Sequence, residues 1–205
     1  MAAMSAGDRP TWSVLVIGGG AAVGKTTAAR AIGARYQASV LPIDGVWLAL
    51  KAVTNPASHP ELHYFDPPDS ELTLPVEQLC ERHIRSAEAI SQAMDPVIEY
   101  YRWEQWPVVL EGAWITPAAA RRWARRYESL HAVFVHEPDV EEVLAAMLVR
   151  SGRRRPTGRK RVLSEVCWLF GNWVREQAEV EGFPVVEARP RATLAERVLA
   201  AIDPG

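Results

Sequence analysis

One stretch of the chain fits the phosphate-binding pattern G-x-x-x-x-G-K-[ST] at every required position: Gly19-Gly20-Ala21-Ala22-Val23-Gly24-Lys25-Thr26. Glycines allow backbone conformations that a Cβ would forbid, so successive N–H groups can turn inward around a phosphate. In this pattern the lysine, here Lys25, reaches the β- and γ-phosphates, and the hydroxyl of Thr26 can bind Mg²⁺. We therefore expect these residues, with the adjoining Thr27, to bind a polyphosphate.

The residues on either side of this stretch provide the structural context that the pattern requires. Residues 14–17 form a short apolar run typical of a buried strand, and residues 26–35 are rich in alanine and favour a helix. Such a helix directs its partially positive N-terminus at the bound phosphate. The alternative, a glycine turn that binds nothing, is disfavoured because both elements are present.

Composition predicts one domain, residues 1–205, with a core of ordinary size. Apolar residues make up 48% of the 205, and the net charge of −2 indicates neither a nucleic-acid nor a membrane partner. No apolar run approaches the ~18–20 residues that span a bilayer. Cys80 and Cys167 lack metal-ligand spacing, so we expect a reduced, cytoplasmic protein. Composition leaves the oligomeric state open.

Strand-like and helix-like segments alternate along the rest of the chain. Further strands are expected at residues 39–43, 108–110, 132–135 and 184–186, and helices at residues 76–94, 118–127, 140–150 and 163–180. Pro96 predicts a kink or a new helix capped by Asp95, and Thr193 with Glu196 forms a capping-box pattern before the last helix. This alternation predicts a three-layer α/β fold: a five-stranded parallel sheet with helices on both faces.

Two carboxylates follow predicted strands and should meet the phosphate loop, because ligands bind beyond the carboxyl ends of parallel strands. Asp44 follows the second strand and could orient or deprotonate a substrate hydroxyl. The alternative is that Asp44 only caps a helix that begins near Trp47. Glu111 ends the third strand and could contact substrate or hold a magnesium-bound water, or it could simply be buried and bonded to backbone.

A basic stretch at residues 150–160 could be a mobile lid that closes on the triphosphate, because guanidinium groups match phosphate oxygens in geometry and stay charged. Within it we favour Arg150 and Arg154 as catalytic. A solvated basic loop and an RNA contact are the alternatives.

Residues 55–75 are rich in Pro, Asp and Ser and predict a loop on the substrate side, with His63, Tyr64 and Asp66 as candidate contacts. His59 and His63 are four residues apart, but Pro60 and the missing third ligand argue against a metal site. The tryptophans, Trp47 and Trp114 among them, are expected to pack rather than to recognise a ligand.

Taken together, these motifs resemble those of the P-loop small-molecule kinases of the nucleoside-monophosphate, shikimate and gluconate kinase type. More narrowly, four segments are similar to bacterial proteins described as 2-phosphoglycerate kinase-like: I-D-G-V-W-L-A-L at 43–50, H-Y-F at 63–65, E-G-A-W-I-T-P at 111–117 and A-R-P-R-A-T-L-A-E-R at 188–197. The resemblance implies ATP with Mg²⁺, a lid at about 150–160, and a nucleotide base near Arg189 and Pro190.

The resulting hypothesis is an ATP-dependent phosphotransferase that acts on a hydroxyl of a small metabolite, expected to be anionic. A regulatory GTPase should carry N-K-x-D and D-x-x-G motifs, and neither is present. A mechanical P-loop ATPase without a small-molecule acceptor should have an Asp-Glu pair closing the third strand, where this chain has Glu111 and then Gly112. A toxin-like nucleotide-sugar kinase would differ only in its acceptor. An RNA-binding module is least favoured, given the net charge.

Overall fold

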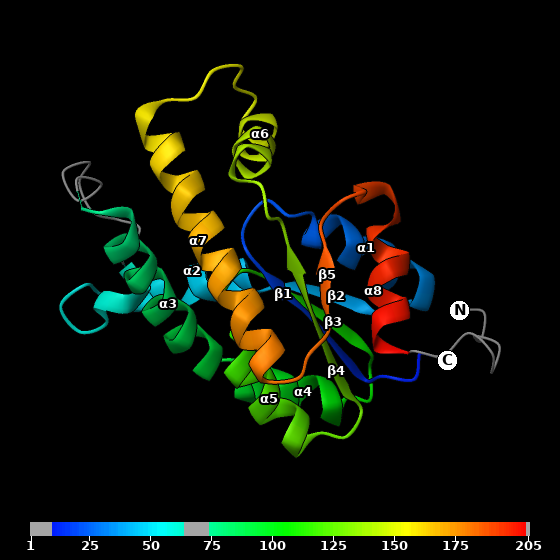
Figure 1. Cartoon of the computed structure of the whole chain (residues 1–205). Helices are drawn as coiled ribbons and strands as arrows, with labels where there is room; N and C mark the ends of the chain where they lie inside the picture. The colour runs from blue at the N-terminus through cyan, green and yellow to red at the C-terminus, as the bar shows by residue number, and fades with distance from the viewer. Residues whose placement is uncertain (1–9, 64–73, 204–205) are drawn as a thin grey trace.

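The structure is a computed structural model, and it describes residues 10–63 and 74–203. Strands and helices alternate along most of the chain (Figure 1). The strands are β1 (Val14–Gly19), β2 (Ser39–Pro42), β3 (Val108–Glu111), β4 (Leu130–His136) and β5 (Val185–Glu187). The α-helices are α1 (Lys25–Tyr36), α2 (Ile43–Val53), α3 (Val76–Gln92), α4 (Asp95–Trp103), α5 (Pro117–Arg126), α6 (Val140–Arg150), α7 (Gly158–Val180) and α8 (Leu194–Ile202), and the 3₁₀ helices are η2 (Pro60–His63) and η4 (Arg191–Thr193).

The five strands form one parallel sheet, as expected, and their order in it is β2-β3-β1-β4-β5. The chain leaves β1 for one side of the sheet and later crosses to the other side, so β1 lies at the point where the strand order reverses. Ligands bind at such a point, beyond the carboxyl ends of the strands. The register aligns Pro42, Glu111 and Ile17 in one row, so the residues just after this row lie together at that edge.

Alternate residues of the strands pack against two separate helical layers, because successive side chains of a strand point to opposite faces. Leu15 and Ile17 join α1 and α8 in one apolar cluster, whereas Val14 and Val16 join α3, α5 and α7 in the other. Figure 1 shows these layers on the two sides of the sheet. The three-layer α/β arrangement predicted from the sequence is therefore confirmed.

Two helices begin earlier than expected. The second strand was predicted to end at Ile43, but α2 starts there, so Asp44 lies inside the first turn of that helix instead of capping one near Trp47. The helix after the basic stretch was predicted to begin at residue 163, but α7 begins at Gly158 because the Thr157 hydroxyl accepts a hydrogen bond from the Lys160 amide, 3.3 Å. The basic stretch at residues 150–160 is thus partly helical.

Two predicted helix caps are wrong in their side-chain chemistry. A new helix does begin beside Pro96, but its first residue is Asp95 and its N-cap is Met94, and the Asp95 carboxylate bonds to Trp123 on α5 instead of capping. Thr193 does occupy the N-cap position of α8, yet its hydroxyl makes no capping bond and instead donates to the Pro190 carbonyl, 3.3 Å.

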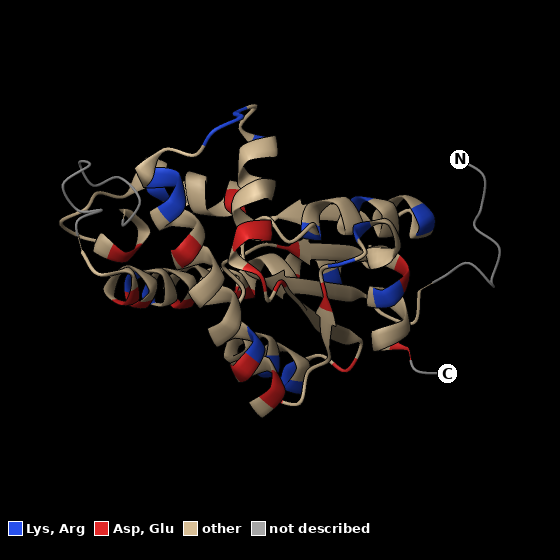
Figure 2. Cartoon of the chain, turned by 45° about the horizontal axis from the view of Figure 1, so that its top comes forward, with Lys and Arg blue, Asp and Glu red and all other residues tan. Residues whose placement is uncertain are grey.

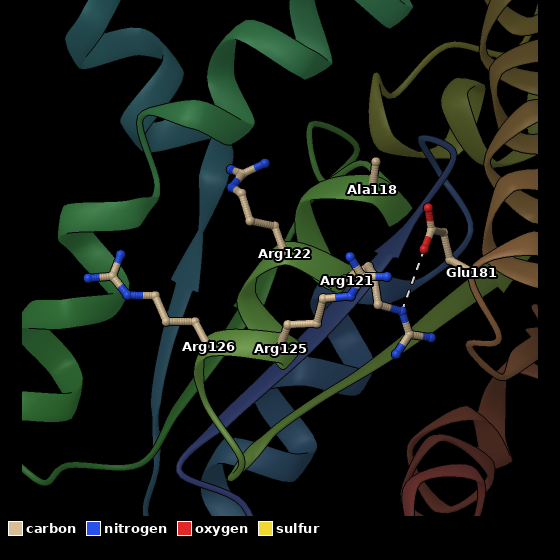
Figure 3. Close-up of a pocket in the computed structure, with 6 residues that line it drawn as sticks. All are labelled: Ala118, Arg121, Arg122, Arg125, Arg126 and Glu181. Carbon is tan, nitrogen blue, oxygen red and sulfur yellow. Dashed lines mark ion pairs between the residues drawn. The ribbon is translucent and has the colours of Figure 1, made fainter.

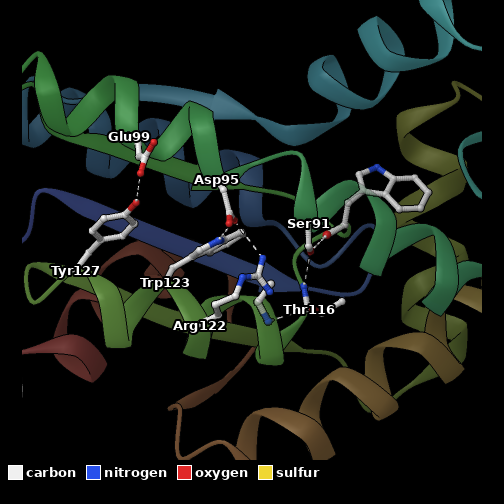
Figure 4. A network of polar contacts seen from close by, with 9 residues as sticks. Ser91, Asp95, Glu99, Thr116, Arg122, Trp123 and Tyr127 are labelled. Atoms are coloured by element: carbon white, nitrogen blue, oxygen red, sulfur yellow. Dashed lines mark hydrogen bonds and ion pairs between the residues drawn. The ribbon is translucent and has the colours of Figure 1, made fainter.

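The helices α4 and α5 are held together by a ladder of polar contacts (Figure 4). Asp95 accepts hydrogen bonds from the indole of Trp123, 2.7 Å, and from Arg122, 3.1 Å. One turn later Glu99 pairs with Arg126 and accepts a hydrogen bond from Tyr127, 3.2 Å. Because Trp123 is only 1% exposed, its N–H depends on Asp95 for an acceptor.

No helix in the described ranges 10–63 and 74–203 has the length and apolar character needed to cross a membrane.

Replacing Asp95 tests this ladder. Asp95→Ala should lower the free energy of unfolding by about 2 kcal/mol, because the buried N–H of Trp123 loses its acceptor. Asp95→Asn keeps an acceptor for the Trp123 N–H and should lower the free energy of unfolding by a smaller amount. Urea titrations of the three proteins at pH 7 measure both effects, and equal losses in the two variants would contradict this account.

The ladder also predicts a pH dependence. Burial raises the pKa of Asp95, but hydrogen bonds from Trp123 and Arg122 outweigh it and hold the pKa below its ordinary value. A lowered pKa in the folded state stabilises the fold above the unfolded pKa of about 4, and this contribution is lost as pH falls through the folded pKa. The stability difference between the wild-type protein and Asp95→Asn should therefore shrink below about pH 4.

Candidate active site

The loop between β1 and α1 has the geometry of an anion-binding nest. Gly19 and Gly24 have φ of 126° and 95°, in the left-handed region that favours glycine, and Ala22 joins them at 64°. A Cβ at position 19 would also lie 2.1 Å from the Val135 carbonyl oxygen. Within the described residues, the backbone amides of residues 21–26 donate no hydrogen bond to the protein. These amides can therefore serve a bound phosphate.

Lys25 folds back over this loop. Its side chain is 6% exposed, and Nζ donates a hydrogen bond to the Gly20 carbonyl oxygen, 2.5 Å. Burial lowers the pKa of Lys25, while the negative charges of Glu111 and Asp44 raise it. Both carboxylates thus lie within electrostatic range of the ammonium group, as expected from their positions after neighbouring strands.

Thr26 and Glu111 are in direct contact. The Thr26 hydroxyl donates to Oε1 of Glu111, 2.9 Å, and Glu111 is 4% exposed. Because the hydroxyl proton is directed at the carboxylate, the lone pairs of the hydroxyl oxygen remain available to a cation. Oxygen ligands of this kind suit Mg²⁺, which binds through few protein groups alongside waters and phosphates. Among the described residues there is no cluster of three or more His, Cys, Asp or Glu side chains that could hold a metal without such help.

Asp44 is exposed at the start of α2, and a tryptophan holds one of its oxygens. The indole Nε1 of Trp114 donates to Asp44 Oδ1, 2.8 Å. The Trp114 ring is buried between the rings of Trp47, 5.1 Å away, and His83, 4.8 Å away and nearly parallel. Trp114 therefore packs, as expected, but it also binds a candidate catalytic carboxylate, which the sequence analysis did not predict.

The ring of His83 acts as a neutral part of this wall. Burial, and after it the charge of Lys25, lowers the pKa of His83 to about 3, so the imidazole carries no charge at neutral pH. Its ring also lies 4.2 Å from that of Phe170 on α7. The aromatic cluster thus links the start of α5, helix α3 and the long helix α7.

Helix α7 also approaches the phosphate loop itself. A Cβ at Gly20 would lie 3.1 Å from the Cys167 carbonyl oxygen and 3.3 Å from the Cα of Gly171. Burial raises the pKa of the Cys167 thiol to about 12, so this cysteine is a packing residue rather than a nucleophile.

The basic stretch stands above this edge of the sheet, in the loop that joins α6 to α7 (Figure 2). Arg150 ends α6 and is exposed, and its charge lowers the pKa of Lys25, which indicates that it lies within electrostatic range. Arg154 is exposed in the loop at residues 151–157. Of the two arginines favoured from the sequence, Arg150 is the one whose charge contributes to the lowered pKa of Lys25.

Arg189, expected near a nucleotide base, is engaged by two carboxylates. Its guanidinium group lies 3.0 Å from Oε1 of Glu137, a buried residue after β4, and 3.6 Å from Glu142 on α6. Pro190, which follows Arg189, accepts a hydrogen bond from Arg197 on α8, 2.8 Å. The next arginine, Arg191, instead reaches the phosphate loop, where it donates to the Ala22 carbonyl oxygen, 3.4 Å.

The remaining predicted contacts lie in or beside the loop after α2. His63 closes η2 and shares a hydrogen bond with the Thr54 hydroxyl through Nε2, 3.0 Å. The indole of Trp47 donates to the neighbouring Leu62 carbonyl oxygen, 2.8 Å, which ties η2 to α2. Tyr64 and Asp66 lie outside the described residues. Thr27 is exposed in the first turn of α1, and its amide donates a hydrogen bond to the Gly24 carbonyl oxygen, 3.1 Å.

A second basic feature lies away from the strand tips, on α5 at the other end of the molecule (Figures 1 and 3). An open pocket of about 380 Å³ is lined there by Ala118, Arg121, Arg122, Arg125, Arg126 and Glu181. Three of its four arginines are ion-paired with acidic residues: Arg121 with Glu181, Arg122 with Asp95 and Arg126 with Glu99. Their positive charge is therefore largely compensated, and the pocket lacks the strand-tip chemistry described above.

Comparisons with known proteins agree with this architecture. No family model and no curated protein matches the sequence. Among solved structures, the chain is similar to a gluconokinase from Sinorhizobium meliloti 1021, with a TM-score of 0.50 and 16% identity over 95% of this chain and 93% of that one. It is also similar to a shikimate kinase from Acinetobacter baumannii in complex with shikimate, with a TM-score of 0.50 and 14% identity over 93% and 96% of the two chains. At these identities the similarity shows the fold alone, a parallel sheet with helices on both faces.

Proposed function

We propose that this chain, as a single domain, is an ATP-dependent kinase that transfers the γ-phosphoryl group to a hydroxyl of a small, anionic metabolite. The observation that carries the proposal is the buried Lys25, which lies beside amides without acceptors and within electrostatic range of Asp44 and Glu111. That combination joins a polyphosphate site to two carboxylates at one edge of a parallel sheet. The fold shared with a gluconokinase and a shikimate kinase agrees with it.

In this proposal the phosphate loop binds and stabilises the transferring group. The amides of residues 21–26 surround the β- and γ-phosphates, and Lys25 compensates the negative charge that develops during transfer. Arg150 adds a second positive charge when the basic stretch at residues 150–160 closes over the triphosphate, and closure excludes water that would otherwise hydrolyse ATP. Arg189 and Pro190 flank the nucleotide base.

The Thr26 hydroxyl would hold magnesium, and Glu111 would orient that hydroxyl. A bound Mg²⁺ would supply positive charge that offsets the charge of the phosphates. The hydrogen bond between Thr26 and Glu111 supports this role, because it directs a hydroxyl lone pair away from the carboxylate. The buried negative charge of Glu111 also favours a cation nearby.

Asp44 orients the acceptor hydroxyl and accepts its proton. Its exposure at the start of α2 and its electrostatic effect on Lys25 support this role. The resemblance of residues 43–50, 63–65, 111–117 and 188–197 to 2-phosphoglycerate kinase-like proteins supports a phosphorylated hydroxy acid as acceptor, with His63 and Tyr64 on the substrate side.

Removing the ammonium group tests the proposal directly. Lys25→Ala and the longer, apolar Lys25→Met should each reduce acceptor-stimulated ADP formation at least roughly 100-fold, because one preorganised charge on the transition state is lost. Circular dichroism and thermal unfolding should show an intact fold in both variants. Turnover at the wild-type rate in either variant would refute the mechanism.

The role of Glu111 is tested through the magnesium requirement. Glu111→Gln keeps a hydrogen-bond acceptor for Thr26 but removes the charge, so the magnesium concentration at half-maximal activity should rise roughly tenfold. Glu187→Gln, which alters an exposed carboxylate at the end of β5, is the matched control and should show the wild-type requirement. An unchanged requirement in Glu111→Gln would leave Glu111 as a buried structural residue.

A further inference from the structure

We propose that Trp114 is a positioning residue for Asp44, and that its indole N–H fixes the carboxylate in the orientation that receives the acceptor hydroxyl. This inference rests on the proposed kinase function and deepens it. It assigns a role to a residue that packs in the core and carries no charge, and that the sequence motifs do not mark as functional.

The first observation is the hydrogen bond itself. Trp114 Nε1 lies 2.8 Å from Asp44 Oδ1 and donates to it, whereas Oδ2 of Asp44 makes no hydrogen bond with any described residue. Asp44 is exposed, so without this bond its carboxylate could rotate freely about χ2. The hydrogen bond therefore engages Oδ1 of Asp44 and leaves Oδ2 available to a substrate hydroxyl.

The second observation is that the donor cannot easily move. Trp114 is 5% exposed, and its ring is stacked on His83 with an interplanar angle of 13° and packed on Trp47 from α2. Its main chain is held as well, because the Ser91 hydroxyl on α3 donates to the Trp114 carbonyl oxygen, 2.7 Å. Figure 4 shows Ser91 meeting the chain just before α5, where it also accepts from the Thr116 amide, 3.3 Å. A fixed donor holds its partner in place, which is how a positioned group contributes to rate.

The third observation connects this donor to the phosphate side of the site. The ring of His83 is stacked on Trp114, and the charge of Lys25 contributes to the lowered pKa of His83. The ring of His83 also packs on Phe170 of α7, and α7 is the helix that contacts the phosphate loop at Gly20. The aromatic cluster therefore connects Asp44 to the phosphate loop through packed side chains. The distance between Asp44 and the loop must be fixed closely if the acceptor oxygen is to attack the γ-phosphate in line.

Trp114→Phe tests the assignment, because it keeps an aromatic ring in the stack and removes only the N–H and the five-membered ring. With Mg·ATP and 2-phosphoglycerate as the first probe, then gluconate and shikimate, kcat should fall roughly tenfold, the effect of one lost hydrogen bond to a charged group. The KM for ATP should stay near the wild-type value, because the phosphate loop is untouched. Introduced into Asp44→Ala, the same change should have little further effect, since the side-chain group that Trp114 positions is already gone.

Trp168→Phe is the matched control. It also removes an indole N–H, but that N–H belongs to α7 and donates to the Pro138 carbonyl oxygen, 2.8 Å, outside the aromatic cluster. This variant should keep kcat near the wild-type value. If Trp114→Phe fails to fold, Ser91→Ala replaces it: it frees the Trp114 carbonyl and should lower kcat at an unchanged KM for ATP.

The outcomes separate this inference from the function on which it rests. A wild-type protein without acceptor-stimulated turnover would overturn the proposed kinase and the role of Trp114 with it. Wild-type turnover that Trp114→Phe leaves unchanged, or lowers no more than Trp168→Phe does, would overturn the role of Trp114 alone. Additive losses in the Asp44→Ala background would show that Trp114 acts other than through Asp44.

Discussion

The burial of the Lys25 ammonium group is the constraint on which the rest of the candidate site depends. A charge removed from water is costly unless opposite charges and hydrogen bonds surround it. Here the Gly20 carbonyl oxygen and the charges of Glu111 and Asp44 offset part of that cost, while burial still lowers the pKa of Lys25. A polyphosphate would supply the missing negative charge. The site therefore favours an anionic ligand at the same point where the loop amides lack acceptors.

The fold brings these groups together without any one segment containing them. The parallel register places Glu111 beside Ile17 and Pro42, so that three strands end in one row. The phosphate loop, Glu111 and Asp44 therefore lie at one edge of the sheet. The helices complete the arrangement, since α7 packs against Gly20 and α8 packs Leu194 near Gly24. Rigid elements thus hold both sides of the loop, which suits a site that acts through positioning and electrostatics.

Much of this could be predicted from the sequence, because glycine spacing, apolar strands and alanine-rich helices are local signals. The phosphate loop, the five strands and the packing stripe of α3 are of this kind. Contacts between distant segments leave no such trace: Trp114 meets Asp44 across 70 positions, and Arg189 meets Glu137 because β4 and β5 are neighbours. The cap expected at Asp95 failed for the same reason, since its carboxylate binds the distant Trp123. The cap expected at Thr193 failed locally, because its hydroxyl bonds to the Pro190 carbonyl three residues earlier.

The central claim is that a ring of backbone amides and one buried ammonium group bind a polyphosphate, and a calorimetric titration with Mg·ATP tests it most directly. The account predicts saturable binding at or below millimolar concentration, with competition from ADP and from inorganic tripolyphosphate but none from adenosine. Competition from tripolyphosphate is the most informative result, because this ligand has the phosphates of ATP without its base. Absence of binding at millimolar Mg·ATP, or competition by adenosine alone, would contradict the account.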